Sequence, residues 1–510
     1  MLKDMDGLRR KNNYRMKNEL TIKEQIEKFH HIHSVYITKE IDELSISFDK
    51  YFFDKNTDET LKLIERAKKI KENSLTLANK MQLNYDIATA YSDLRNIDHV
   101  DSYLEKEILH YRKVIMFYEE NQDKVSDDEL FVLNYIAMRT YTNLGNALKA
   151  TGRYVASIDS FFNALSIEES FSMASLNLSR TLLDYSFLQT RKYEEQYYQH
   201  ASYYYLEYTK KYDYNLENLE YLSGLKKAFS IFHKNYINNF LTKELKLPDY
   251  FVDDEKEKIY RDYIGLFRLF LEPCAEILPD PCFLVDSLVL PFNAGEGKDE
   301  FIGLFNQLKA EYIHARYLWY ISEDNKQKYF FEKDIDLVDT KDTANYSYND
   351  TLMRMSFRII YSAFDRIGFF INEYFNVGLK GSNVSFKNIW KEELKGRDGE
   401  VYFTIPNPLT KQLDNIGLKA LYWLQKDLLD DKKVCVTDPY SIIMFKMRND
   451  MEHNVLRTVD DLAINKTSKF TTFVTEGQIE HNAFRILKLF REALIYLVIA
   501  INEDIKNKNN

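Results

Sequence analysis

The chain has 510 residues and a formal net charge of −10 at pH 7, with 45% hydrophobic and 29% charged residues. This composition is typical of a folded protein and excludes a largely disordered chain, while the length predicts at least two packed units. The negative net charge excludes a protein that binds nucleic acid over its whole surface, so any RNA site must be a local basic patch.

We expect a cytoplasmic protein with no membrane partner. The N-terminus is charged and has no apolar core of a signal peptide. The longest apolar run, Ala493–Ile501, is much shorter than the roughly 20 residues that span a bilayer. Three cysteines are too few for a dense disulfide framework, and they are expected to be reduced.

The first 240 residues contain no proline and few glycines, which predicts long, uninterrupted helices. One stretch within them, 141–169, has a spaced pattern of aromatic, apolar and small residues. The pattern consists of Tyr141, Leu144, Gly145, Leu148, Ser157, Phe161 and Ala164. It resembles the tetratricopeptide repeat, in which a small residue lets the second helix approach the first. Glu169 stands where that repeat ends in proline, so the junction to the next helix is less sharply defined.

Weaker echoes of the pattern precede and follow this stretch. They are Ile87, Ala88 and Tyr91 on one side, and Leu178, Ser179, Leu182, Ala201, Tyr205 and Tyr208 on the other. Residues 1–245 are therefore predicted to form a tetratricopeptide-like helical solenoid, which implies a surface for a peptide or protein partner. The alternative is a non-repetitive helical bundle.

A change in composition marks the boundary of this first domain. Four of the eight prolines fall between Glu272 and Pro291, and we assign residues 246–299 to a proline-containing connector. Residues 300–510 then return to amphipathic helical patterns, at 300–322, 350–378, 438–459 and 479–505. Four such helices with one insertion predict an α-helical bundle, which makes the whole chain all-α.

The third of these helices carries the polar stretch "KMRNDMEHNV". Arg448 and His453 are separated by four residues, and Asn449 follows the arginine directly. In a four-helix bundle this arrangement resembles the HEPN (higher eukaryotes and prokaryotes nucleotide-binding) ribonucleases, over roughly Glu300–Asp504. The resemblance is greatest to bacterial members that carry N-terminal helical repeats.

The resemblance implies metal-independent cleavage of RNA that leaves a 2′,3′-cyclic phosphate, with no cofactor. A histidine can transfer protons near neutral pH, and an arginine can stabilise the charge of a phosphorane-like transition state. His453 and Arg448 are the candidates for these roles. Asn449 lies four residues before His453 on the same helix face and is expected to orient the imidazole.

Helix geometry adds a prediction about assembly. Five residues at about 100° each place Arg448 and His453 about 140° apart around the helix. A second copy could supply the missing groups, in agreement with the family habit of forming the site at a dimer interface. We therefore predict a homodimer through the HEPN bundle, with the helix 441–459 lying against its symmetry mate.

Other residues are assigned supporting roles. Asp450, Glu311 and Arg316 are candidates to line the site, although ion pairing alone would also explain Glu311 and Arg316. Lys446 and Arg457 are candidates to bind RNA. In the alternative interpretation the stretch is a solvated helix face, on which Arg448 pairs with Glu452 and His453 has no role.

The sequence thus predicts a HEPN endoribonuclease regulated by a tetratricopeptide-like domain, with a role in bacterial defence or as a toxin. The alternative is a non-enzymatic scaffold whose degenerate HEPN bundle dimerises or binds nucleotide or RNA. Low overall basicity and the acidic residues Asp450 and Glu452 favour this alternative.

Overall fold

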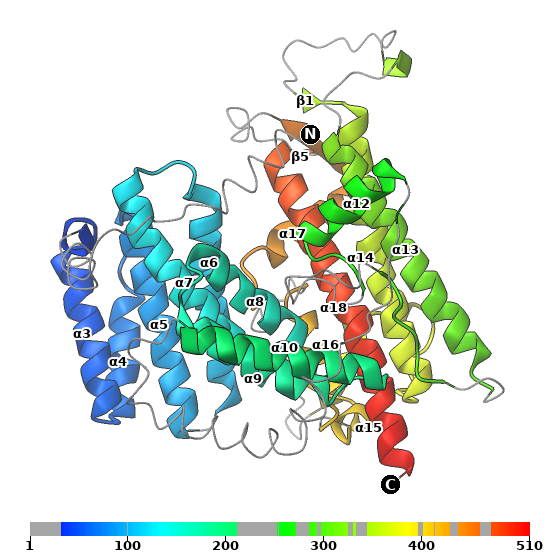
Figure 1. The fold of residues 1–510 in the computed structure, drawn as a ribbon, viewed down its shortest axis with the longest axis horizontal. Helices are drawn as coiled ribbons and strands as arrows, with labels where there is room; N and C mark the ends of the chain where they lie inside the picture. The colour runs from blue at the N-terminus through cyan, green and yellow to red at the C-terminus, as the bar shows by residue number, and fades with distance from the viewer. Residues whose placement is uncertain are drawn as a thin grey trace. The chain divides into compact units, whose positions relative to one another are not determined.

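The structure, a computed structural model, describes residues 32–98, 100–211, 252, 254–271, 285–292, 297–324, 330–332, 344–395, 401–412, 414–428, 437–459 and 471–509. Helices dominate it, which confirms the all-α class. By packing, the chain divides into two units (Figure 1). The first comprises Met1–Phe187, Tyr198–Glu244 and Asp431–Pro439, and the second comprises Leu188–Tyr197, Leu245–Asp430 and Tyr440–Asn510.

Consecutive antiparallel helices build the first unit. They are α3 (Lys39–Phe53), α4 (Thr57–Ala67), the short 3-10 helix η1 (Glu72–Ser74), α5 (Leu77–Asp98), α6 (Asp101–Asn121), α7 (Asp127–Ala150), α8 (Tyr154–Ile167), α9 (Ser172–Ser186) and α10 (Lys192–Lys211), of which the part from Tyr198 belongs here. Each helix from α5 to α9 packs on the next one in the chain, as it does in a helical solenoid.

The α7–α8 pair packs through the residues that suggested a repeat. A Cβ added to Gly145 would lie 2.6 Å from the Phe161 ring, so only glycine allows this approach. Phe161 and Ala164 are fully buried, and the Ser157 hydroxyl donates to the Gly145 carbonyl at 2.7 Å. The contact between the helices is therefore the one that the sequence pattern predicts.

The next pair repeats this contact with a shift of one residue. Ser179, which stands 34 residues after Gly145, exchanges two hydrogen bonds of 2.7 Å with Ser202. Ser202, and not the predicted Ala201, is thus the counterpart of Ser157. The assignment of these helices to the tetratricopeptide repeat stays a prediction.

The second unit is a helical bundle with two small sheets. Its helices are α12 (Glu255–Leu266), α13 (Asp299–Asp324), α14 (Tyr348–Tyr374), α15 (Asn407–Thr410), α16 (Ile416–Gln425), α17 (Ser441–His453) and α18 (Glu476–Asn509), with the 3-10 helices η4 (Phe330–Glu332), η5 (Gly381–Asn383) and η6 (Asn388–Trp390). Its strands are β1 (Ala344–Asn345), β2 (Glu392–Lys395), β3 (Val401–Thr404), β4 (Val455–Val459) and β5 (Thr471–Thr475).

Helix α18 forms the centre of this bundle. In Figure 1 it runs beside α13 and α14, and it also packs on α16. Every residue of the apolar run Ala493–Ile501 is buried, as a helix that is apolar all round requires. Gly417 permits the contact with α16, because a Cβ there would lie 2.3 Å from the Ala500 nitrogen. Among the described helices, none is both long and apolar enough to cross a membrane.

The described part of the predicted connector groups with the second unit. The second unit includes α12 and residues 285–292, and Arg316 of α13 is hydrogen-bonded to the Leu269 carbonyl and to Asp286. This part of 246–299 therefore belongs to the bundle.

The helix predicted at 438–459 is shorter than expected. It ends at His453, and the backbone turns extended at Asn454 before β4 begins at Val455. The sequence "VLRTV" contains three β-branched residues, which favour a strand over a helix. Strand β4 pairs antiparallel with β1 and parallel with β5. The prediction of a continuous helix to Val459 was wrong for this reason.

Candidate functional site

The predicted motif lies along α17 and ends at its last residue. Asn449 and His453 are four residues apart on one face, together with Lys446 one turn before Asn449. Lys446 and His453 are exposed, and Asn449 is half-buried. Because His453 ends the helix, its imidazole is open to solvent and accessible to a ligand.

Arg448 lies on another side of α17, facing α14. Its Nη1 donates to the Asn449 carboxamide oxygen at 3.0 Å. That oxygen thus engages Arg448, whereas the sequence suggested that Asn449 would orient His453. The Asp365 carboxylate of α14 interacts electrostatically with Arg448.

Asp365 is held beside Arg448 by a neighbouring loop. Its Oδ1 accepts a hydrogen bond of 3.1 Å from the Phe386 N–H. Although Asp365 lies on the exposed side of α14, partial shielding of its carboxyl from water raises the pKa, and the Phe386 N–H and the charges of Arg448 and Arg366 oppose this shift. Gly368, three residues along α14, lets Ser385 and Phe386 come this close, since a Cβ there would lie 2.5 Å from the Phe386 nitrogen.

Asp450 has a structural position at the end of the helix. The residue is buried, and its Oδ1 accepts a hydrogen bond of 2.9 Å from the Asn454 side chain. The Asn454 N–H also donates to the Asp450 carbonyl at 3.2 Å. Asp450 therefore fixes the turn from α17 into β4, which sets the position of His453 between them.

Glu452 pairs with a residue that the sequence did not suggest. Its carboxylate accepts hydrogen bonds from Arg358 of α14, at 3.0 Å from Nε and 3.3 Å from Nη2. The solvated-face interpretation expected Arg448 as its ion-pair partner. The pair with Arg358 instead joins α17 to α14 across the bundle.

The two supporting residues on α13 have different surroundings. Glu311 forms an ion pair with Arg366 of α14, two residues whose helices pack side by side. Arg316 is only 2% exposed and binds Asp286 in bidentate fashion, at 2.8 and 2.7 Å. A buried guanidinium satisfied in this way favours the ion-pairing alternative for Arg316, and its role at the site stays a prediction.

The remaining candidates are Lys446 and Arg457. Lys446 is exposed on α17, and Arg457 is half-buried in β4. Lys446 thus lies on the helix that carries the motif, and Arg457 lies on the strand that follows it.

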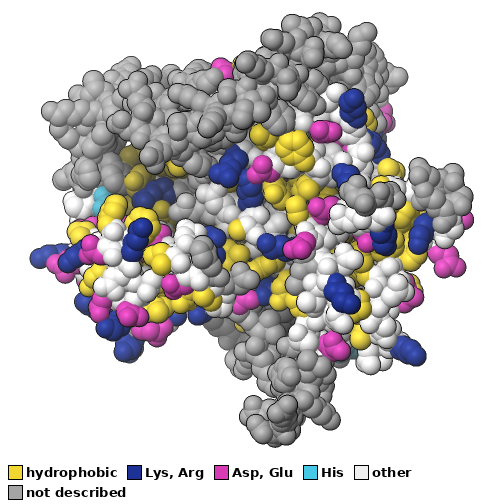
Figure 2. Space-filling model, turned by 90° about the horizontal axis from the view of Figure 1, so that it is seen from below, with side chains coloured by type: hydrophobic (Ala, Val, Ile, Leu, Met, Phe, Trp, Pro, Cys, Tyr) yellow, Lys and Arg dark blue, Asp and Glu magenta, His cyan; other side chains and the backbone are white. Residues whose placement is uncertain are grey.

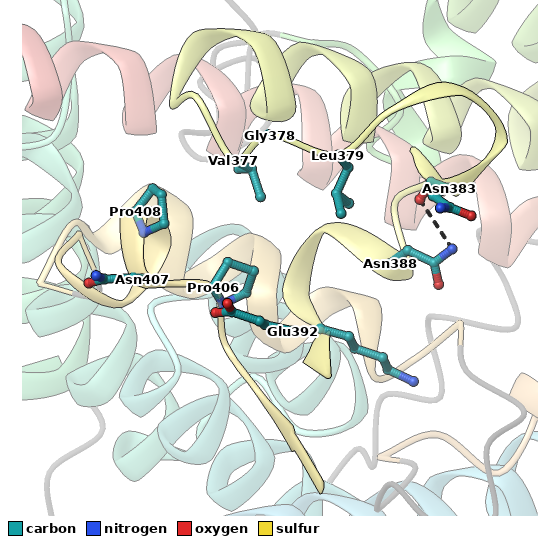
Figure 3. A pocket seen from close by; sticks show the side chains of 10 residues that line it. Val377, Gly378, Leu379, Asn383, Asn388, Glu392, Pro406, Asn407 and Pro408 are labelled. Atoms are coloured by element: carbon teal, nitrogen blue, oxygen red, sulfur yellow. Dashed lines mark hydrogen bonds between the residues drawn. The ribbon is translucent and has the colours of Figure 1, made fainter. Parts of the chain in front are cut away.

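A separate cavity of about 440 Å³ lies beyond the C-terminal end of α14. Figure 3 shows Val377 and Leu379 on one side of it and Pro406 and Pro408 on the other, with Asn388 donating to the Asn383 carbonyl. None of the motif residues lines it. The cavity is therefore distinct from the cluster around α17.

Sequence reasoning missed Arg358, which lies beside the motif as Asp365 does. Both lie on the exposed stripe of α14, whose members are Thr351, Met355, Arg358, Ser362, Asp365, Phe369 and Glu373. Their heptad-like spacing was the available signal, because polar residues that recur at this spacing mark one outward helix face.

Comparison with known proteins identifies the second unit. Residues 292–504 match the family model described as LA2681-like HEPN. No curated protein and no solved structure matches the chain. The matched range contains α13, α14, α16 and α17 and most of α18, and it agrees with the resemblance found in the sequence over Glu300–Asp504. Residues 292–504 of this chain are therefore similar to the LA2681-like HEPN domain.

Proposed function

We propose that the protein is a metal-independent endoribonuclease with Arg448 and His453 in its active site. One observation carries the proposal: within a HEPN domain, an exposed histidine ends the same helix that presents a half-buried arginine one and a half turns earlier. Histidine supplies proton transfer and arginine supplies a permanent positive charge, which are the two requirements for cleaving RNA by its own 2′-hydroxyl.

In the proposed reaction the 2′-oxygen attacks the adjacent phosphorus and the 5′-oxygen leaves. A base removes the proton of the 2′-hydroxyl, and an acid protonates the departing 5′-oxygen, which yields a 2′,3′-cyclic phosphate. His453 serves as one of these groups, while Arg448 binds the phosphate oxygens. Asn449 holds one arm of the Arg448 guanidinium and thereby positions it.

A second copy of the chain would supply the other proton-transfer group. The exposed stripes of α14 and α17 carry the apolar side chains Met355, Phe369 and Ile442, which are 45%, 47% and 58% exposed. His453 belongs to the stripe of α17, so a dimer formed through these faces brings two histidines into one groove.

Mixing chains tests this assembly. An Arg448→Ala chain and a His453→Ala chain are each expected to be inactive. A mixed dimer keeps one intact copy of each residue, so part of the activity should return. A fully active monomer, or no recovery in a mixture shown to contain mixed dimers, would contradict the shared site.

Purified full-length protein with total RNA tests the chemistry. We expect cleavage that persists in EDTA, leaves cyclic phosphate ends and falls by at least about 100-fold in His453→Ala, the lower bound for general acid–base catalysis. Arg316→Lys serves as a control for altered packing, since Arg316 is buried away from solvent. Cleavage that stops on chelation, or that survives His453→Ala, would rule out this mechanism.

For the first unit we propose a regulatory role, in which its helical surface binds a peptide or protein and controls the nuclease. Solenoids bind partners rather than catalyse reactions, and an unregulated ribonuclease would harm the cell. A bacterial defence or toxin system is the setting that fits both properties. Expression of the wild type should therefore be toxic when the partner is absent, and co-expression of a captured partner should change that toxicity.

A non-enzymatic scaffold is the second candidate, and surface charge favours it. On the face shown in Figure 2, Lys and Arg side chains alternate with Asp and Glu over the described surface, and the whole chain has a net charge of −10. Toxicity separates the two candidates. If the protein is a scaffold, cells should tolerate the wild type, Arg448→Ala and His453→Ala equally well. If it is an enzyme, only the wild type should be toxic.

A further inference from the structure

Two arginines one turn apart on α14 have different tasks. Arg354 donates to the Leu456 carbonyl at 2.8 Å and to the Thr458 hydroxyl at 2.7 Å, so it fastens β4 to the helix. Arg358 has a side chain that is 48% exposed, and it reaches the Glu452 carboxylate at the end of α17. Arg354 is thus committed to the fold, whereas Arg358 lies at the surface beside the motif.

The Glu452 carboxylate is held by hydrogen bonds in the way that a protein holds a bound anion. Arg358 binds its carboxylate through Nε and Nη2, in the forked arrangement that guanidinium groups also use for phosphates. These hydrogen bonds lower the pKa of Glu452, and the charges of Arg358, Arg448 and His453 act in the same direction. Arg358 of α14 thus binds the Glu452 carboxylate directly, and Arg448 and His453 of α17 act on it electrostatically.

We propose that Arg358 is a phosphate-binding residue of the RNA site, and that the Glu452 carboxylate occupies the place of an RNA phosphate when RNA is absent. The inference rests on the proposed function, because it takes RNA as the ligand of the α17 motif. Carboxylate and phosphodiester are both anions with two oxygens available to a guanidinium, so one can replace the other.

The exposure of the pair makes this exchange feasible. The Arg358 and Glu452 side chains are 48% and 30% exposed, and ion pairs at such positions are weak because water competes for both partners. A phosphate held at the same time by Arg448 would outcompete a single carboxylate. Glu452 thus acts as an internal competitor of RNA, and its removal should strengthen binding while the loss of Arg358 should weaken it.

Binding of a short, mixed-sequence 2′-O-methyl RNA tests the proposal by fluorescence anisotropy. This probe lacks the attacking hydroxyl, so binding is measured without cleavage. We expect Glu452→Gln to bind about two- to fivefold more tightly, the equilibrium equivalent of a surface ion pair. Arg358→Gln should bind about tenfold more weakly, as expected for the loss of one charge-assisted hydrogen-bonding group.

Salt dependence identifies a phosphate contact specifically. For single-stranded RNA each neutralised phosphate contributes about 0.7 to the slope of log K against log salt, so the slope should decrease by about that amount in Arg358→Gln. Arg358→Lys retains the charge and should keep the slope while losing part of the affinity. The pair Arg261 and Glu257 on α12 offers a matched control, since it has a similar exposed ion pair, at 2.7 Å, elsewhere in the same unit.

Different results would overturn the two proposals. If Glu452→Gln and Arg358→Gln bind the probe as the wild type does, or change no more than Glu257→Gln and Arg261→Gln, the assignment of Arg358 is wrong even when unmodified RNA is cleaved. If neither the wild type nor any variant binds the probe, the assignment of Arg358 is wrong as well. Binding that shifts in the two expected directions, without any cleavage of unmodified RNA, would support Arg358 and reject the nuclease.

Discussion

Replacing Gly368 by alanine should destabilise the second unit and disturb the motif. A Cβ at this position would lie 2.5 Å from the Phe386 nitrogen and 2.6 Å from the Ser385 carbonyl carbon. Both are backbone atoms, so the loop must move by about 0.9 Å to restore an ordinary contact of 3.4 Å, the difference between 3.4 and 2.5 Å. This movement stretches the hydrogen bond from Phe386 to Asp365.

The expected cost follows from these contacts. Overpacking a filled site costs about 1–3 kcal/mol, and weakening a hydrogen bond to a charged group adds about 1 kcal/mol. The higher helix propensity of alanine relative to glycine offsets about 1 kcal/mol of this loss. The net loss of about 2 kcal/mol should lower the melting temperature by about 4–8 °C for a unit of this size.

Tryptophan fluorescence can follow this unit alone, because the three tryptophans of the chain, Trp319, Trp390 and Trp423, all lie in it. Gly303→Ala in α13 is the matched control: a Cβ there meets nothing within 4 Å, so it should raise the melting temperature by about 2–4 °C. If Gly368→Ala unfolds at or above the wild-type temperature, the close approach of the loop to α14 is not a structural requirement.

Two further changes concern the first unit. Burial raises the pKa of Asp86 to about 7, against the ordinary value of 3.8, so the folded state keeps a proton that the unfolded chain releases. Stability should therefore decrease as the pH rises from about 4 to about 7, and Asp86→Asn should remove this decrease, which amounts to about 4 kcal/mol at most. Calorimetry at pH 5 and pH 8 measures the part above pH 5, about 3 kcal/mol, and an unchanged pH dependence in the variant would contradict the assignment. Gly145→Ala should cost about 2 kcal/mol because its Cβ meets the buried Phe161 ring, and adding Phe161→Leu should restore part of that stability in urea unfolding. If the double variant is no more stable than Gly145→Ala, the clash with the ring is not the cause.

In Asp86→Asn, the asparagine side chain can keep the hydrogen-bond partners of Asp86. Asp86 accepts hydrogen bonds from Gln82 and from the Ser45 hydroxyl. In the variant the amide oxygen still accepts from Gln82, and the Ser45 hydroxyl can accept from the amide while it donates to the Ile41 carbonyl, which lies at 3.1 Å. The comparison therefore isolates the charge of Asp86.

Helices with strong local signals could be predicted from the sequence. Apolar residues at helical spacing predict the long helices α13, α14 and α18. The resemblance to HEPN domains, which was based on the motif within such helices, is confirmed. The pairing of strand β1 with β4 could not be predicted in this way, because it joins segments that are more than 100 residues apart in the chain. Helix α16 was missed because it is short and its main contact, Gly417 against Ala500, is not local.

For the candidate site the limit is similar. Local spacing identified Arg448, Asn449 and His453 as one cluster, whereas their neighbours Arg358 and Asp365 come from a helix some 90 residues earlier. Only packing shows that Arg316 is buried against Asp286 while Arg358 is exposed beside Glu452, although both are arginines on amphipathic helices.

The junction between α17 and β4 has a consequence for the motion of His453. The last residues of a helix usually fray, because their carbonyls have no partners further along. Here the chain enters a strand two residues after His453, and Arg354 ties that strand to α14. A histidine fastened on both sides loses less conformational entropy when it meets a substrate, and the amides of Leu456 to Thr458 should exchange hydrogen more slowly than those at an ordinary helix end.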